Sequence, residues 1–396
     1  MNKVFGISFI IIGVCLNEWT IKLISNYETK FDSIEKSVFL ILIQILFISA
    51  GIYIIIKKKR AIQNIFILFL TLFILIVSFE IILSISYFQN LSSSAPIWIP
   101  QKYKNISIEI NKRHQLKSLS NQYFFNDINR SYKKDTSTNI RIAVLGDSFI
   151  WGAGVPDSVI WTRKLEKLFI RNGIECEMLN WGKSGWSTLN EYNFLKNEGY
   201  KYQFDYLIFA FVVNDPIMDS SIHKLFIYPK GFIESNILKP FSLVFPNTVS
   251  FSTDLFNNFF STYSDYGYFN WLKNKVYIQN NLADYSNLLE DIKKYCEERN
   301  IPFVFILTPE NHNPILKKYF NQIIDILKKD EIPYYNLFPV IENALNKYSI
   351  RELWANPADG HPGNLVTEVY SINVYDYLIN DLNIMPNKPK LMNHYR

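Results

Sequence analysis

Cysteine is scarce in this chain, and none of its three cysteines has a neighbour at the spacing of a metal site or a CxxC redox motif. Cys15 lies in an apolar run, Cys176 on a predicted strand and Cys296 on a predicted helix. We interpret all three as unpaired thiols that act as small hydrophobic side chains. A disulfide between Cys176 and Cys296 is the alternative. The pattern predicts no metal centre.

Net charge is also small, at +5 over 396 residues, and the basic residues are scattered except for the cluster Lys57-Lys58-Lys59-Arg60. Proteins that bind nucleic acid carry a basic patch or stripe along one face. This sequence has none, and we therefore exclude nucleic acid as a partner.

Apolar sequence, in contrast, is abundant near the start of the chain. Residues 37–56 carry no charge over a length that spans a hydrocarbon core of about 30 Å as a helix. Residues 62–88 form a second run, which Glu80 interrupts, and residues 4–24 form a weaker third run that could instead be a signal-like segment. We predict about three transmembrane helices within residues 1–88, with Glu80 at the membrane interface.

The basic cluster decides the predicted orientation. It lies between the second and third spans, so the positive-inside rule places this short loop, together with Lys3, in the cytoplasm. Everything after about residue 90 is then delivered outside. We predict an integral, multi-pass protein of the cytoplasmic membrane whose soluble part is extracytoplasmic.

Residues 89–139 are rich in Ser, Asn and Lys and are predicted to form a stalk or lead-in. Strands and helices then alternate, which predicts an α/β domain with a parallel sheet over residues 140–381, followed by a tail at 382–396. An aromatic-rich insertion at 217–280 breaks the alternation; it is either a lid or a packing or membrane-facing surface. The expected strands are 140–145, 174–180, 205–213, 302–308 and 332–336, and the expected helices are 159–171, 187–198, 281–299, 314–329, 337–347 and 364–381.

Polar segments follow three of these strands, and another precedes the last helix. Gly146-Asp147-Ser148, the run 180–188, Asn214-Asp215 and Asp359-Gly360-His361-Pro362 would all meet at one edge of a doubly wound sheet. Ser148 is a candidate nucleophile and His361 a candidate base, while Asp359 could fix the imidazole tautomer.

The remaining polar groups suit an oxyanion site. The backbone amides of Ser148 and Gly185 and the side-chain amide of Asn214 are three candidate donors. Asp147 is expected to shape the nucleophile turn, and Gly182 is expected to form a turn earlier in its loop. Together these groups predict acyl chemistry on a serine.

These motifs resemble those of the SGNH (GDSL-type) hydrolase family, which is named for a serine, a glycine, an asparagine and a histidine in separate motifs. The matching residues are Ser148, Gly185, Asn214 and His361. The resemblance covers residues 140–215 well and 300–381 more loosely, but neither the membrane region nor the insertion. It implies a flavodoxin-like three-layer αβα fold and ester or acyl chemistry without a cofactor.

One departure concerns the acid. The family commonly places two residues between the aspartate and the histidine, whereas only Gly360 separates Asp359 from His361 here. In an extended segment residues i and i+2 face the same side, so the pair could still interact. The alternative is a Ser–His dyad in which a backbone carbonyl orients the ring.

We therefore expect a membrane-anchored extracytoplasmic serine esterase that acts on O-acyl esters of envelope glycans or lipids. One alternative is an O-acyltransferase that uses the same triad to acylate an envelope polysaccharide, with the acyl donor passed on by a membrane partner. Another is a non-catalytic envelope protein with a vestigial site.

Overall fold

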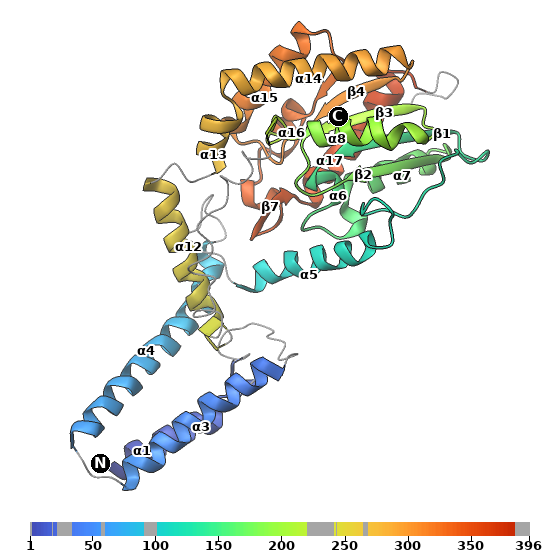
Figure 1. Ribbon diagram of the computed structural model, residues 1–396. Helices are drawn as coiled ribbons and strands as arrows, with labels where there is room; N and C mark the ends of the chain where they lie inside the picture. The colour runs from blue at the N-terminus through green and yellow to red at the C-terminus, as the bar shows by residue number, and fades with distance from the viewer. Residues whose placement is uncertain are drawn as a thin grey trace. The chain divides into compact units, whose positions relative to one another are not determined.

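The computed structural model describes residues 2–17, 19–21, 34–56, 60–90, 101–219, 241–242, 244–263 and 268–384. These residues belong to two compact units, which are described separately below (Figure 1). Unit 1 lies within Met1–Asn105 and Ile227–Ser264, and unit 2 lies within Ile106–Phe226 and Asp265–Arg396. The basic residues 57–59, residues 220–240 of the insertion and most of the tail lie outside the described residues.

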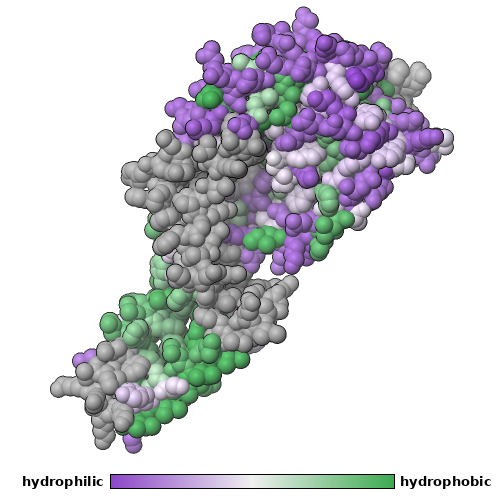
Figure 2. Space-filling model, viewed as in Figure 1, coloured by the Kyte–Doolittle hydropathy of each residue, from purple (hydrophilic) through white to green (hydrophobic). Residues whose placement is uncertain are grey.

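Unit 1 is built from apolar helices, which colour most of its described surface as hydrophobic in Figure 2. Among the described residues, one helix is long and apolar enough to cross a membrane, over Ile67–Ser84. Two shorter apolar stretches cover Gly6–Cys15 and Leu40–Ile56, so the prediction of three spans stays a prediction. The helices are α1 (Asn2–Cys15), α3 (Ile34–Ile56), α4 (Arg60–Asn90) and α12 (Pro246–Tyr263).

Helix α12 comes from the insertion and packs on α4. The Phe73 and Phe245 rings lie 6.0 Å apart, and those of Phe79 and Phe251 lie 5.4 Å apart. Glu80, expected at the membrane interface, is fully buried within unit 1. Its carboxylate accepts hydrogen bonds from the first turn of α12, and these bonds compensate for the loss of water. The insertion thus breaks the strand–helix alternation because part of it returns to unit 1.

Unit 2 is organised around the predicted parallel sheet, which is confirmed. Its five strands run in the order β2-β1-β3-β4-β5, which is the flavodoxin-like order. All neighbouring strands pair in parallel. The strands fall within one or two residues of the expected ranges: β1 (Ile140–Gly146), β2 (Cys176–Gly182), β3 (Tyr206–Phe211), β4 (Phe303–Leu307) and β5 (Tyr334–Asn336).

Alternate residues of the central strands point into two separate cores. Leu207 and Phe209 join one core, and Ile208 and Ala210 join the other, as expected for a strand whose side chains alternate between faces. Helices α8 (Thr188–Asn197), α14 (Gln279–Glu298) and α15 (Pro314–Lys329) supply the first core; α7 (Trp161–Arg171), α16 (Phe338–Leu345) and α17 (Asn364–Asp376) supply the second. The sheet therefore lies between two helical layers.

The two cores also settle the cysteine question. Cys176 lies in the core on one face of the sheet and Cys296 in the core on the other, and both thiols are free. The alternative of a disulfide between them is therefore wrong.

Short elements complete unit 2. A two-stranded antiparallel hairpin, β6 (Trp354–Asn356) with β7 (Asp359–Pro362), carries the late Asp-Gly-His-Pro motif. The other short elements are α6 (Ser148–Trp151), α13 (Tyr268–Trp271), the 3-10 turns Asp157–Val159, Gly199–Lys201 and Ile350–Leu353, and the π-turns Leu272–Val276 and Tyr377–Asp381.

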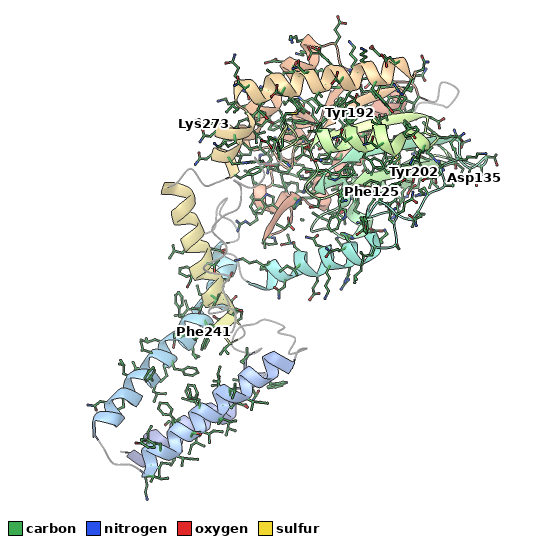
Figure 3. All side chains as sticks on the ribbon, in the orientation of Figure 1. Phe125, Asp135, Tyr192, Tyr202, Phe241 and Lys273 are labelled. Atoms are coloured by element: carbon green, nitrogen blue, oxygen red, sulfur yellow. The ribbon has the colours of Figure 1, made fainter. Side chains whose placement is uncertain are left out.

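The predicted stalk contains a helix and packed chain. Helix α5 (Gln101–Ser118) lies within it (Figure 1), and residues from Ile106 onward belong to unit 2. Phe125 is 2% exposed and packs against Phe194 at 5.0 Å; Figure 3 labels it within the body of unit 2. The buried Asp127 forms an ion pair with Arg163 and accepts a hydrogen bond from the backbone amide of Asn180. A single buried aromatic ring and several polar contacts fix this segment, so its packing leaves little hydrophobic pattern.

Candidate active site

Ser148 stands at the start of a single helical turn directly after β1. Asp147 caps this turn, because its carboxylate accepts from the Phe149 amide at 2.8 Å. The turn's free carbonyls are satisfied by two buried amides: Asn180 donates to Ile150 O at 2.9 Å, and Asn126 donates to Trp151 O at 2.8 Å. A strand, a cap and two amides thus fix the serine in place.

The structure brings the three candidate catalytic residues together. Ser148 Oγ lies 3.0 Å from His361 Nε2, within hydrogen-bond distance. On the other side of the ring, His361 Nδ1 donates to Asp359 Oδ1, and the His361 backbone amide donates to the same oxygen at 3.2 Å. Serine, imidazole and carboxylate therefore form one hydrogen-bonded chain.

The short spacing of the acid and the base follows from β7. Asp359 and His361 are two positions apart on an extended strand, so both side chains point to the same face. Gly154 lies against this pair at φ +74°, and a Cβ at this position would overlap Asp359 Oδ2. Only glycine fits both the left-handed backbone and the close approach.

The charges of the pair support each other. Burial disfavours ionised Asp359, but hydrogen bonds and the charge of His361 outweigh burial and lower the carboxyl pKa to about 2. Burial likewise disfavours the His361 cation, yet the bond to Asp359 and the charges of Asp359, Asp147 and Glu310 raise its pKa above the ordinary 6.5. The site therefore favours an ionised Asp359 beside an imidazole that is more basic than usual.

The predicted oxyanion donors lie in loops that follow β2 and β3. Gly185 is exposed and has φ +83°, a conformation that L side chains rarely adopt. The side-chain amide of Asn214 donates a hydrogen bond to the carboxylate of Asp147, which precedes Ser148. Gly182 was expected to form a turn, but it is the last residue of β2 and pairs with Gly146; a Cβ there would overlap the backbone of Ile150 and Trp151. Gly182 thus allows close packing behind the nucleophile turn.

Two further carboxylates lie near His361: Asp147, which the sequence analysis selected, and Glu310, which it did not. Glu310 follows β4 at the same edge, and its buried Oε2 has no hydrogen-bond partner among the described residues. Burial raises the Glu310 pKa to about 7. Burial also raises the pKa of Asp147. Hydrogen bonds from Phe149 and Ser148 and the charge of His361 act in the opposite direction but do not cancel this rise. A polar residue directly after a strand was the available signal for Glu310.

The remaining histidines of the described chain make other bonds. His312 Nε2 lies 3.0 Å from the Tyr348 carbonyl, and His114 Nε2 lies 2.7 Å from the Val155 carbonyl. Within the described residues, no group of three or more His, Cys, Asp or Glu side chains could hold a metal ion.

No profile of a known protein family matches the sequence, and no curated protein matches it. An acetyl xylan esterase, AlAXEase, aligns with 11% identity over 61% of this chain and 100% of its own, at a TM-score of 0.37. A catalytic mutant of an acetylxylan esterase from Geobacillus stearothermophilus aligns with 9% identity over 61% of this chain and 94% of its own, at 0.35. Esterase EstA from Pseudoalteromonas sp. aligns with 15% identity over 61% and 98%, at 0.36. Scores and identities this low carry no argument about activity.

Proposed function

We propose that this protein is a serine esterase that cleaves O-acyl esters by an acyl-enzyme mechanism. The hydrogen-bonded chain from Ser148 through His361 to Asp359 is the observation that carries the proposal. Serine is a weak nucleophile unless a base is held against it and a third group orients that base. His361 and Asp359, both half-buried, meet these two requirements beside the buried Ser148.

In the proposed reaction, Ser148 Oγ attacks the ester carbonyl and its proton passes to His361 Nε2. Asp359 stabilises the imidazolium, which then gives the proton to the departing alcohol. Water, activated by His361, releases the acyl group from Ser148. The Ser148 and Gly185 amides and the Asn214 side chain stabilise the tetrahedral oxyanion, and each such donor is worth about 10²-fold in rate.

Substrate and location follow from the sequence. The apolar helices and the basic cluster at 57–60 support an integral membrane protein with unit 2 on the extracytoplasmic side. Acylated envelope glycans and lipids are the esters that an enzyme in this place would meet. The resemblance to the SGNH motifs supports the same chemistry. Ser148, Gly185 and Asn214 each follow a strand of the parallel sheet, and His361 lies on the β6–β7 hairpin.

The test uses the full chain, purified in detergent. We expect a fluorophosphonate probe to label the protein and p-nitrophenyl acetate to be hydrolysed, and we expect both activities to vanish in Ser148→Ala. Ser158→Ala, an exposed serine ten positions further along the chain, is the matched control and should retain both activities.

Two outcomes would change the proposal. A folded protein that neither labels nor hydrolyses would contradict it and favour a non-catalytic role. If the protein labels but turns over only when a glycan acceptor or a membrane acyl donor is added, with the acyl group recovered on the glycan, the same triad performs O-acyl transfer instead of hydrolysis.

A further inference from the structure

Helix α5 contacts unit 2 through a polar face. Ser107, Asn111, His114 and Ser118 recur at spacings of four, three and four, which place them on one side of a helix. Asn111 accepts from the Gly154 amide at 2.8 Å and His114 donates to the Val155 carbonyl at 2.7 Å. These contacts fix α5 along the segment that packs against the catalytic acid.

Ser107 is the member of this face that reaches the triad. Its side chain is 8% exposed, and its hydroxyl donates to the Asp359 carboxylate. The Asn356 side-chain amide donates in turn to Ser107 Oγ. Because Asn356 occupies a lone pair of that oxygen, the hydroxyl proton is free to point at Asp359.

We propose that Ser107 is a positioning residue for the catalytic acid, so that α5 completes the esterase site from outside the α/β sheet. The inference rests on the proposed function. The relay runs from Asn356 through Ser107, Asp359 and His361 to Ser148, and hydrogen bonds in such a chain polarise one another.

The relay has an electrostatic consequence that a purely structural serine would lack. The donated hydrogen bond disperses the negative charge of Asp359 and helps to lower its pKa. Without this bond, the carboxylate attracts the His361 cation more strongly, and the pKa of His361 rises. Less neutral base is then present at a given acidic pH, and the ring is also held less firmly.

The experiment compares Ser107→Ala with wild type in the full-length protein in detergent. The pKa of His361 is read from the ¹³C resonance of labelled histidine, assigned through a His361→Gln variant. The rate of fluorophosphonate labelling is read across pH. We expect Ser107→Ala to raise the His361 pKa, to move the acidic limb of the labelling profile to higher pH, and to slow labelling about tenfold below that limb.

Three matched variants separate positioning from folding. Ser107→Thr keeps the hydroxyl and should restore the wild-type profile. Ser118→Ala removes another buried serine of α5, whose hydroxyl donates to Gln115 O within the helix at 2.8 Å, and should change neither readout. Asn356→Ala removes the donor that orients Ser107, together with the acceptor of the Ala358 backbone amide, and should shift the His361 pKa in the same direction by less.

The outcomes are distinguishable. If wild type labels and folded Ser107→Ala keeps the wild-type His361 pKa and profile, the positioning role is wrong and the esterase proposal stands. If Ser107→Ala does not fold, an unchanged His361 pKa in Asn356→Ala overturns the relay. If wild type fails to label while the His361 pKa still responds to Ser107, the relay holds and the proposed activity fails.

Discussion

Asp359 shows how a single residue's role depends on local backbone geometry. With one residue between it and His361, the pair departs from the spacing of the family that the motifs resemble. An extended strand compensates, because it brings the side chains of both residues to one face. The same geometry lets the His361 backbone amide bond the carboxylate at 3.2 Å. A helix or a tight turn over the same residues would have separated them.

We predict that Asp359→Asn slows ester hydrolysis by about 10³- to 10⁴-fold, because an amide neither stabilises the imidazolium nor enforces the tautomer. The wild-type activity needs neutral His361, and because the pKa of His361 is raised, the acidic limb of the profile lies at higher pH than an ordinary imidazole would give. Loss of the carboxylate charge lowers that pKa and moves the limb to lower pH. The measurement is kcat/KM for p-nitrophenyl acetate against pH.

Asp325→Asn, an exposed position on α15, is the control and should leave the profile unchanged. If Asp359→Asn keeps both the rate and the limb of wild type, the site works as a Ser–His dyad.

Among the elements, α7 and α5 show why some helices are visible in the sequence and others are not. Helix α7 buries Trp161, Leu165 and Phe169, which recur every four residues and predict a helix. Helix α5 instead buries Ser107, His114 and Ser118, so the same periodicity exists in polar residues, which an apolar pattern does not detect. The insertion helix α12 depends on an even more distant partner, Glu80 of α4.

We predict that Glu80→Ala weakens the packing of α12 on α4. The carboxylate accepts from the Asn247 amide at 2.9 Å and from the Thr248 amide and hydroxyl at 2.7 Å each, at the start of α12. Removal leaves these donors unsatisfied in a buried place, at a cost of about 1–3 kcal/mol. The midpoint of thermal unfolding in detergent should fall, and α12 should become cleavable by protease.

Glu109→Ala, an exposed carboxylate on α5, should leave both measurements unchanged. Equal unfolding midpoints for Glu80→Ala and wild type would show that the buried carboxylate is not needed for this packing.

At the scale of the whole molecule, the chain forms two units, and each unit is built from two separate segments of the sequence. Unit 1 contains the apolar helices and residues 227–264, and unit 2 contains the sheet and the candidate catalytic side chains. The chain therefore passes between the units more than once. Unit 2 presents a mostly hydrophilic face in Figure 2, in contrast to the helices of unit 1.

We predict that unit 2 lies outside the cytoplasmic membrane. Alkaline phosphatase folds only where its disulfides can form, so it is active only when exported. A fusion to the C-terminus of the full chain should be active, whereas a fusion that truncates the chain after Lys59 should be inactive. The reverse pattern would place the catalytic side chains in the cytoplasm and contradict the predicted orientation.

The sequence by itself determined the parallel sheet and the side chains at its edge. Strand ends carry both the apolar run and the polar residue that follows it, so Ser148 and Asn214 could be selected from local pattern; His361 was selected from the polar motif before the last helix. Such strands can be recognised in a sequence because a strand buried on both faces must be apolar along its whole length.

Only the tertiary structure decided which groups surround those side chains. Ser107 and Glu310 reach the site from segments that are distant from Ser148 in the chain, and Gly154 approaches Asp359, which is distant from it; the contacts are a hydrogen bond, a charge interaction and a close approach of backbone. Such contacts depend on the three-dimensional position of single atoms and not on a repeating pattern. The return of α12 to α4 was undetectable for the same reason, since one buried carboxylate and a few aromatic contacts hold it there.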